Sequence, residues 1–137
     1  MFKDTQERDS IMKDKSSALK VKSKIWIELE GEVVFGLGRI AIFEAIEKTG
    51  SMKQAAALLG MSYRAAWGKV TATEERLKLQ LVERNQGNRR SGTVLTPAGK
   101  ELLRRFSLFQ EEAEKNIDEL FENHISDLLQ HLKHEKK

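Results

Sequence analysis

The chain has 137 residues, of which 39% are hydrophobic and 33% charged, enough for one small core beneath a large solvated surface. It has no cysteine, which excludes disulfide bonds and thiolate metal sites, and no run of about 18 uncharged apolar residues, which excludes a membrane-spanning helix. The net charge of +3 is unevenly spread: residues 60–100 carry eight Lys or Arg against three Asp or Glu, and residues 101–137 carry six against nine. We therefore expect a polyanionic partner for the middle of the chain.

Two segments precede the first predicted helix. Residues 1–18 are rich in Lys, Asp and Ser and have no hydrophobic period, so they are predicted to form a loose arm. They lack the apolar core of a signal peptide, and we expect a cytoplasmic protein. Residues 19–35 alternate between apolar and polar side chains on either side of Glu30-Gly31, which predicts a β-hairpin that turns at this pair.

Three helices are predicted next. Apolar residues at helical spacing indicate a first helix over residues 40–49, after a break at the glycines before it. Ser51 is expected to cap a short, alanine-rich helix that Gly60 ends. Ser62 is expected to cap a third, longer helix that runs to about Lys78.

The remaining elements are two short strands and a long helix. Residues 81–84 and 93–95 are predicted as strands, joined by the polar loop 85–92. Thr96 and Pro97 then start a helix, since proline is well tolerated at the first helical position. Apolar residues recur every three or four positions as far as Leu132, so we expect one continuous helix, roughly 50 Å long.

The order of these elements is that of a winged helix-turn-helix. The sequence therefore predicts a mainly α fold with a small β component, an N-terminal β-hairpin and a long C-terminal dimerisation helix. We expect three segments: a polar arm at 1–18, a DNA-binding winged helix-turn-helix at 19–96, and a dimerisation helix with a charged tail at 97–137.

The third helix is the candidate DNA reader. At about 100° per residue, one face should point to the core, and it carries Ala66, Val70, Thr73 and Leu77. The opposite face near the N-terminal end is predicted to enter a major groove; it comprises Tyr63, Arg64, Trp67, Gly68, Lys69 and Thr71. Arginine can read guanine with two hydrogen bonds, and glycine lets the backbone approach closely. The alternatives are that Arg64 and Lys69 are solvated surface charges and that Trp67 packs on a neighbouring element.

Two further places are predicted to contact DNA. In the loop, Arg89 and Arg90 lie between glycines and can reach phosphates or a minor groove, the alternative being a polar loop with no such role. Ser51 and Lys53 lie at the start of the short helix, where backbone N–H groups bind phosphate readily. For Ser51 the alternative is simple capping, and both can hold together.

Several stretches together resemble the N-terminal domain of ModE-type molybdate-responsive regulators and, more distantly, the DNA-binding domain of LysR-type regulators. These stretches are residues 50–56, 59–67, 81–84 and 94–96, followed by Gly99. The similarity runs from about Val21 to Phe109. It implies a winged-helix fold, homodimerisation and promoter binding, and it implies that Ser62, Tyr63, Arg64 and Trp67 begin the recognition helix.

The sequence also departs from that family. ModE-type regulators carry oxyanion-binding domains of β structure after the DNA-binding domain, whereas this sequence predicts no strand beyond Leu95. We therefore expect those domains to be lacking and do not extend the resemblance to molybdate sensing.

The apolar stripe of the last helix approximates a heptad pattern, which favours pairing with a second copy. The predicted dimer contacts are Phe109, Ile117, Leu120, Phe121, Ile125 and Leu128. The alternative is that the first half packs on the winged domain and the second half frays.

The sequence as a whole predicts a sequence-specific transcriptional regulator that binds double-stranded DNA as a homodimer at a palindromic promoter site. It indicates no enzyme, no catalytic residue, no cofactor, no membrane contact and no small-molecule effector. His131 and His134 have a spacing that could bind a metal on a helix, but a solvated tail explains them better, and we predict no metal site. Two other functions stay open: a winged fold that docks a partner protein, and a nonspecific architectural DNA binder.

Overall fold

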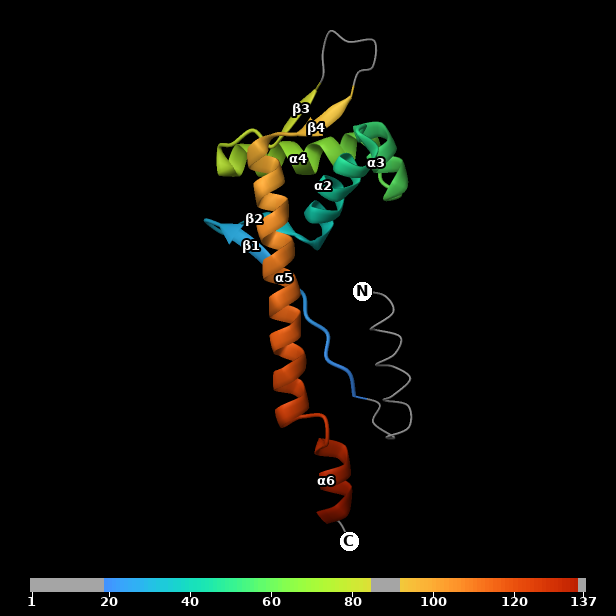
Figure 1. Ribbon diagram of the computed structural model, residues 1–137, viewed down its shortest axis with the longest axis vertical. Helices are drawn as coiled ribbons and strands as arrows, with labels where there is room; N and C mark the ends of the chain where they lie inside the picture. The colour runs from blue at the N-terminus through green and yellow to red at the C-terminus, as the bar shows by residue number, and fades with distance from the viewer. Residues whose placement is uncertain (1–18, 85–91, 136–137) are drawn as a thin grey trace. The chain divides into compact units, whose positions relative to one another are not determined.

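A computed structural model describes residues 19–84 and 92–135 of the chain (Figure 1). The contacts divide the chain into two compact units, one of Lys24–Gln110 and the other of Met1–Ser23 with Glu111–Lys137. The loose arm predicted for residues 1–18 and the loop arginines Arg89 and Arg90 lie outside the described residues.

The predicted hairpin is present but shorter than expected. Strands β1 (Trp26–Leu29) and β2 (Glu32–Gly36) pair in antiparallel fashion, and residues 19–25 are not in a strand. The turn lies at Glu30 and Gly31, whose φ angles of 52° and 83° are both in the left-handed region. Two consecutive left-handed residues match the twist of a tight hairpin, so the turn lies at the pair where the sequence predicted it.

Three helices follow: α2 (Leu37–Thr49), α3 (Met52–Leu58) and α4 (Tyr63–Leu77). α2 begins three residues earlier than the apolar pattern indicated, because glycine weakens a helix mainly in its interior and Gly38 lies in the first turn. The predicted caps are confirmed: the Ser51 hydroxyl accepts the N–H of Gln54 at 3.1 Å, and the Ser62 hydroxyl accepts the N–H of Ala65 at 3.0 Å.

Gly60 ends α3 in the way that the sequence predicts. Its φ of 68° is left-handed. Its N–H donates to Ala57 at 3.1 Å, and the N–H of Met61 donates to the carbonyl of Ala56 at 2.9 Å. These two bonds form a Schellman motif, which satisfies carbonyls at the helix end and redirects the chain toward α4.

Strands β3 (Val82–Arg84) and β4 (Thr93–Leu95) form the base of the wing. The carboxylate of Glu74 on α4 accepts the N–H groups of Leu81 and Val82 at 2.7 and 3.1 Å. The carbonyl of Leu81 accepts the N–H of Thr96 at 2.9 Å. β3 is therefore tied to α4 on one side and to the strand-to-helix junction on the other.

The hydrophobic core of the unit Lys24–Gln110 contains side chains from the hairpin, from α2, α3 and α4, from the wing base and from the helix that begins at Pro97. The Phe35 ring centroid lies 5.4 Å from that of Phe43 and 4.9 Å, edge to face, from that of Phe106. The largest fully buried side chains are Phe35, Phe43, Ile42, Ile46, Leu81, Val70 and Thr73. The elements confirm the predicted mainly α fold with its small β component.

The prediction of one unbroken C-terminal helix is wrong. α5 (Pro97–His124) ends before residues 125–127, and α6 (Leu128–Glu135) follows them. The N–H groups of Ile125 and Ser126 both donate to the carbonyl of Phe121, and the Ser126 hydroxyl donates to that of Glu122 at 3.0 Å. A serine hydroxyl that bonds back to the preceding turn bends a helix, and apolar periodicity alone does not show this competition.

Gly99 lies where the first turn of α5 packs against Leu81, the residue before β3, and it provides a test of this packing. A methyl group at Gly99 would overlap the carbonyl oxygen of Leu81, which is backbone and cannot rotate away. We expect Gly99→Ala to lower the free energy of unfolding by about 1–3 kcal/mol, as overpacking does. Urea unfolding followed by circular dichroism measures this.

Gly68→Ala is the matched control, because a methyl group at Gly68 meets nothing within 4 Å and the residue lies inside α4. This variant should gain about 0.5–1 kcal/mol of stability, since alanine is the better helix former. Equal effects of the two substitutions would contradict the proposed close approach of α5 to β3.

Candidate nucleic-acid interface

α4 has one buried face and one exposed face in its N-terminal half. Ala66, Val70 and Thr73 are buried, and Leu77 packs against the core, as the helical spacing predicts. Most of the predicted DNA-reading side chains lie on the exposed face, and Tyr63 is 49% exposed. The exposed set is Ser62, Tyr63, Arg64, Gly68, Lys69 and Thr71. This leaves a polar, basic surface free at the start of the helix.

Trp67 differs from the rest of that set. It is half-buried and packs against the hydrophobic core, as the packing alternative held. Its ring lies 6.4 Å from that of Tyr63 in an edge-on arrangement, and the guanidinium carbon of Arg84 lies 4.2 Å from its centroid. Arg84 was not among the residues predicted to contact DNA, although the sequence places this basic residue at the end of the strand before the wing.

The start of α3 combines a cap with an exposed cation. Ser51 uses its hydroxyl oxygen to cap the helix, so the capping role is present, and Lys53 is exposed. The wing base reaches this region through the N–H of Thr93, which donates to the carbonyl of Gly50 at 2.9 Å. The hydrogen bond connects β4 to the turn between α2 and α3, so the wing base is tied to the helix-turn-helix.

Two other arginines have structural partners. Nε of Arg39 donates to the hydroxyl of Thr73 at 2.8 Å, and that hydroxyl donates to the carbonyl of Val34 at 3.1 Å. Arg76 pairs with Glu32 at 3.3 Å. Burial lowers the pKa of the Arg39 guanidinium, and the positive charge of Arg76 lowers it further. Arg39 joins α2 to α4 and Arg76 joins the hairpin to α4, which makes both side chains poor candidates for DNA contacts.

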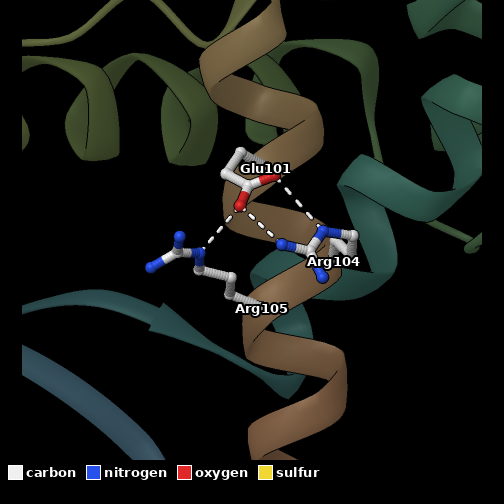
Figure 2. A network of polar contacts seen from close by, with 3 residues as sticks. All are labelled: Glu101, Arg104 and Arg105. Atoms are coloured by element: carbon white, nitrogen blue, oxygen red, sulfur yellow. Dashed lines mark hydrogen bonds and ion pairs between the residues drawn. The ribbon is translucent and has the colours of Figure 1, made fainter.

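A second pair of arginines lies on α5 around one carboxylate, as Figure 2 shows. Glu101 accepts hydrogen bonds from Arg104, at 2.6 Å in the shorter of two contacts, and from Arg105 at 2.7 Å. These hydrogen bonds, Arg104 first, lower the pKa of the Glu101 carboxyl to about 2. The two cations are therefore partly neutralised within the helix.

The described residues do not bring together three or more His, Asp or Glu side chains in a group that could hold a metal ion. None of the helices in the described ranges has both the length and the apolar character needed to cross a membrane.

Residues 37–100 match the bacterial regulatory helix-turn-helix proteins of the lysR family. This range begins with α2 and ends in the first turn of α5. This part of the chain is therefore similar to a LysR-type helix-turn-helix domain. The predicted resemblance and the predicted winged helix-turn-helix fold are thereby confirmed.

Curated relatives extend the similarity to the ModE group. The chain is 38% identical over 76 residues to the molybdenum-pterin-binding protein MopB of Rhodobacter capsulatus, an alignment that covers 55% of this chain and 28% of that protein. It is 34% identical over 85 residues to the molybdenum transport protein ModE of Azotobacter vinelandii, covering 61% and 32% of the two chains. The chain thus spans less than a third of the length of these two relatives.

Among solved structures, the DNA-binding domain in the CbnR–DNA complex has the same fold as this LysR-type domain. The TM-score is 0.50 at 28% sequence identity, and the match covers 60% of this chain and 90% of that domain. The fold of this domain therefore has a counterpart in a structure that contains DNA.

The ion pairs of Glu101 predict a pH dependence. Because the folded pKa lies below the ordinary value of 4.5, the ion pairs contribute stability above that value and lose it as the pH falls toward 2. We expect the Glu101 carboxyl, followed by carbon NMR, to titrate near pH 2. In Arg104→Ala the midpoint should rise toward 4.5, and an unchanged midpoint would show that Arg104 does not hold the carboxylate.

Proposed function

We propose that this chain is a DNA-binding transcriptional regulator, which binds as a homodimer to a palindromic promoter site. The observation that carries the proposal is the exposed polar and basic face at the start of α4, in a domain of the LysR type. A major groove admits one α-helix, and the N-terminal residues of a recognition helix contact its base edges. The solved CbnR relative is a complex with DNA, which supports the same use of this domain here.

The proposed contacts are divided between bases and phosphates. Arg64 is the best candidate for base reading, because it is exposed and has no ion-pair partner among the described residues. Phosphate contacts are proposed for Lys53 and for the cations of the wing, Arg89 and Arg90. The remaining proposed contacts are Ser51, Ser62, Tyr63, Gly68, Lys69 and Thr71.

The direct test is selection of bound fragments from genomic DNA with the purified full chain. A shared inverted-repeat motif among the selected fragments is the expected outcome. Fragments with no common motif would instead indicate a nonspecific DNA binder, and the absence of any retained DNA would favour a protein-docking role.

Arg64→Ala tests base reading at the recognition helix. We expect it to weaken binding to the selected site by about 1–3 kcal/mol, the cost of losing a bidentate base contact, while binding to random DNA changes less. Fluorescence anisotropy on both duplexes measures this. Arg104→Ala removes the same charge from α5 and should leave both affinities unchanged; wild-type affinity in Arg64→Ala would remove this residue from the reading surface.

Exposed apolar side chains on α5 and α6 support the homodimer. Phe109 is 50% exposed, Leu120 57%, Ile125 41% and Leu128 38%, while Ile117 and Phe121 are half-buried. Apolar side chains exposed in series along helices usually mark an interaction site. Two linked domains would also bind two half-sites with the second contact intramolecular, which raises affinity without new contacts.

A charge placed in this stripe should disrupt the dimer. We expect sedimentation equilibrium to give a dimer for the wild-type chain at micromolar concentration and a monomer for Leu120→Glu, because dimerisation would bury the new carboxylate. Lys115→Glu places a carboxylate at an exposed position on the opposite face of α5 and should remain dimeric. A wild-type monomer that still binds an inverted repeat tightly would contradict the dimerisation role.

A further inference from the structure

Arg84 is the last residue of β3, immediately before the wing loop. Its guanidinium carbon lies 4.2 Å from the centroid of the Trp67 ring, so a wing-base cation is stacked on a side chain of α4. We propose that Arg84, held on the face of Trp67, binds a phosphate of the DNA backbone at the junction of α4 and the wing. The proposal deepens the function proposed above and rests on it.

The charge of Arg84 is available for such a contact. The side chain is exposed, and within the described ranges no carboxylate forms an ion pair with it. It differs in this respect from Arg76, which pairs with Glu32, and from Arg104, which pairs with Glu101. Stacking uses the flat face of a guanidinium and leaves its N–H groups free at the edge, where they can donate to phosphate oxygens.

The elements beneath Arg84 hold it in place. Trp67 packs against the core. Glu74 lies about two turns further along the same face of α4, and it accepts the N–H groups of Leu81 and Val82 at the start of β3. An ordered side chain loses less conformational entropy on binding than a mobile one, so an arginine fixed in this way binds a phosphate at lower cost.

A hollow of about 330 Å³ lies beside the stack, lined by Trp67, Glu74, Gln80, Val82 and Arg84. The carboxylate of Glu74 is the one acidic group of this lining, and one of its oxygens already accepts two backbone N–H groups. Among the described residues this hollow leaves space next to the guanidinium, where a phosphate can approach its edge.

The tryptophan itself supports the assignment. Its Nε1 is buried with no hydrogen-bond partner among the described residues, and an unsatisfied donor has a cost that phenylalanine would avoid. The indole ring, however, binds a cation more strongly than a phenyl ring does. We assign Trp67 as a positioning residue for Arg84, in place of the direct DNA contact that the sequence indicated.

The first experiment measures the affinity of the full chain for the selected duplex and for a random duplex over a range of salt concentrations. Arg84→Ala should weaken binding to both by a similar factor and lower the slope of log affinity against log salt by about one unit, because one phosphate contact is lost. Arg84→Lys should keep the slope near the wild-type value but bind more weakly, since lysine cannot stack as a flat fork. Arg104→Ala is the charge-matched control and should change neither quantity.

The second experiment tests the positioning role. Trp67→Leu should weaken DNA binding, Trp67→Phe should restore most of it, and Arg84→Ala should add little in the Trp67→Leu background, since the two residues act together. Circular dichroism and thermal unfolding confirm that each variant is folded. Trp26→Phe leaves Trp67 as the only remaining tryptophan of two, so its fluorescence should change on addition of DNA and no longer do so when Arg84→Ala is added.

The outcomes separate this proposal from the function on which it rests. If the wild-type chain binds no DNA, the proposed function fails. If the wild-type chain binds and Arg64→Ala has its expected effect, but Arg84→Ala keeps the wild-type affinity and salt slope, the phosphate contact is overturned. A loss confined to the selected duplex would also overturn it, because it would show that Arg84 reads a base.

Discussion

The backbone of Leu81 is held at both of its polar groups, and the geometry of the winged domain depends on this. Its N–H donates to the carboxylate of Glu74, and its carbonyl accepts the N–H of Thr96 and lies against Gly99, where any side chain would overlap it. Its side chain is fully buried. Charge-assisted hydrogen bonds are about twice as strong as neutral ones, so the Glu74 carboxylate is an effective anchor for β3. α4, the wing base and the start of α5 are joined at this one residue.

The arginines of the described domain divide into structural and available ones. Arg39 joins α2 to α4 through Thr73, Arg76 joins the hairpin to α4 through Val33 and Glu32, and the α5 pair shares Glu101. Arg64 and Arg84 have no such partners there and lie on α4 and on the strand that leads into the wing. A large part of the affinity of proteins for DNA comes from cations that are free to replace counterions, so the position of unpaired cations is more informative than their number.

Local signals in the sequence predicted most of the fold. The structure reproduces the helix ends that single residues marked in the sequence: Ser51 and Ser62 as caps, Gly60 as a stop and Pro97 as a start. Caps and turns depend on residues close together in the chain, so the sequence alone predicts them. The buried face of α4 followed from spacing alone. The break after His124 was missed, since the apolar period continues through residues 125–127 while the hydroxyl of Ser126 competes for the helix carbonyls.

The candidate site was only partly visible in the sequence. The exposed basic face of α4 follows from its helical period. The sequence by itself determined this face, the fold class and the family resemblance. The role of Trp67 as a platform, the pairing of Arg76 with Glu32, and the availability of Arg84 were decided by the tertiary structure. Each of these features depends on a neighbour that folding brings close. Arg84, for example, lies 17 positions after Trp67 in the sequence, and local periodicity does not predict a contact between them.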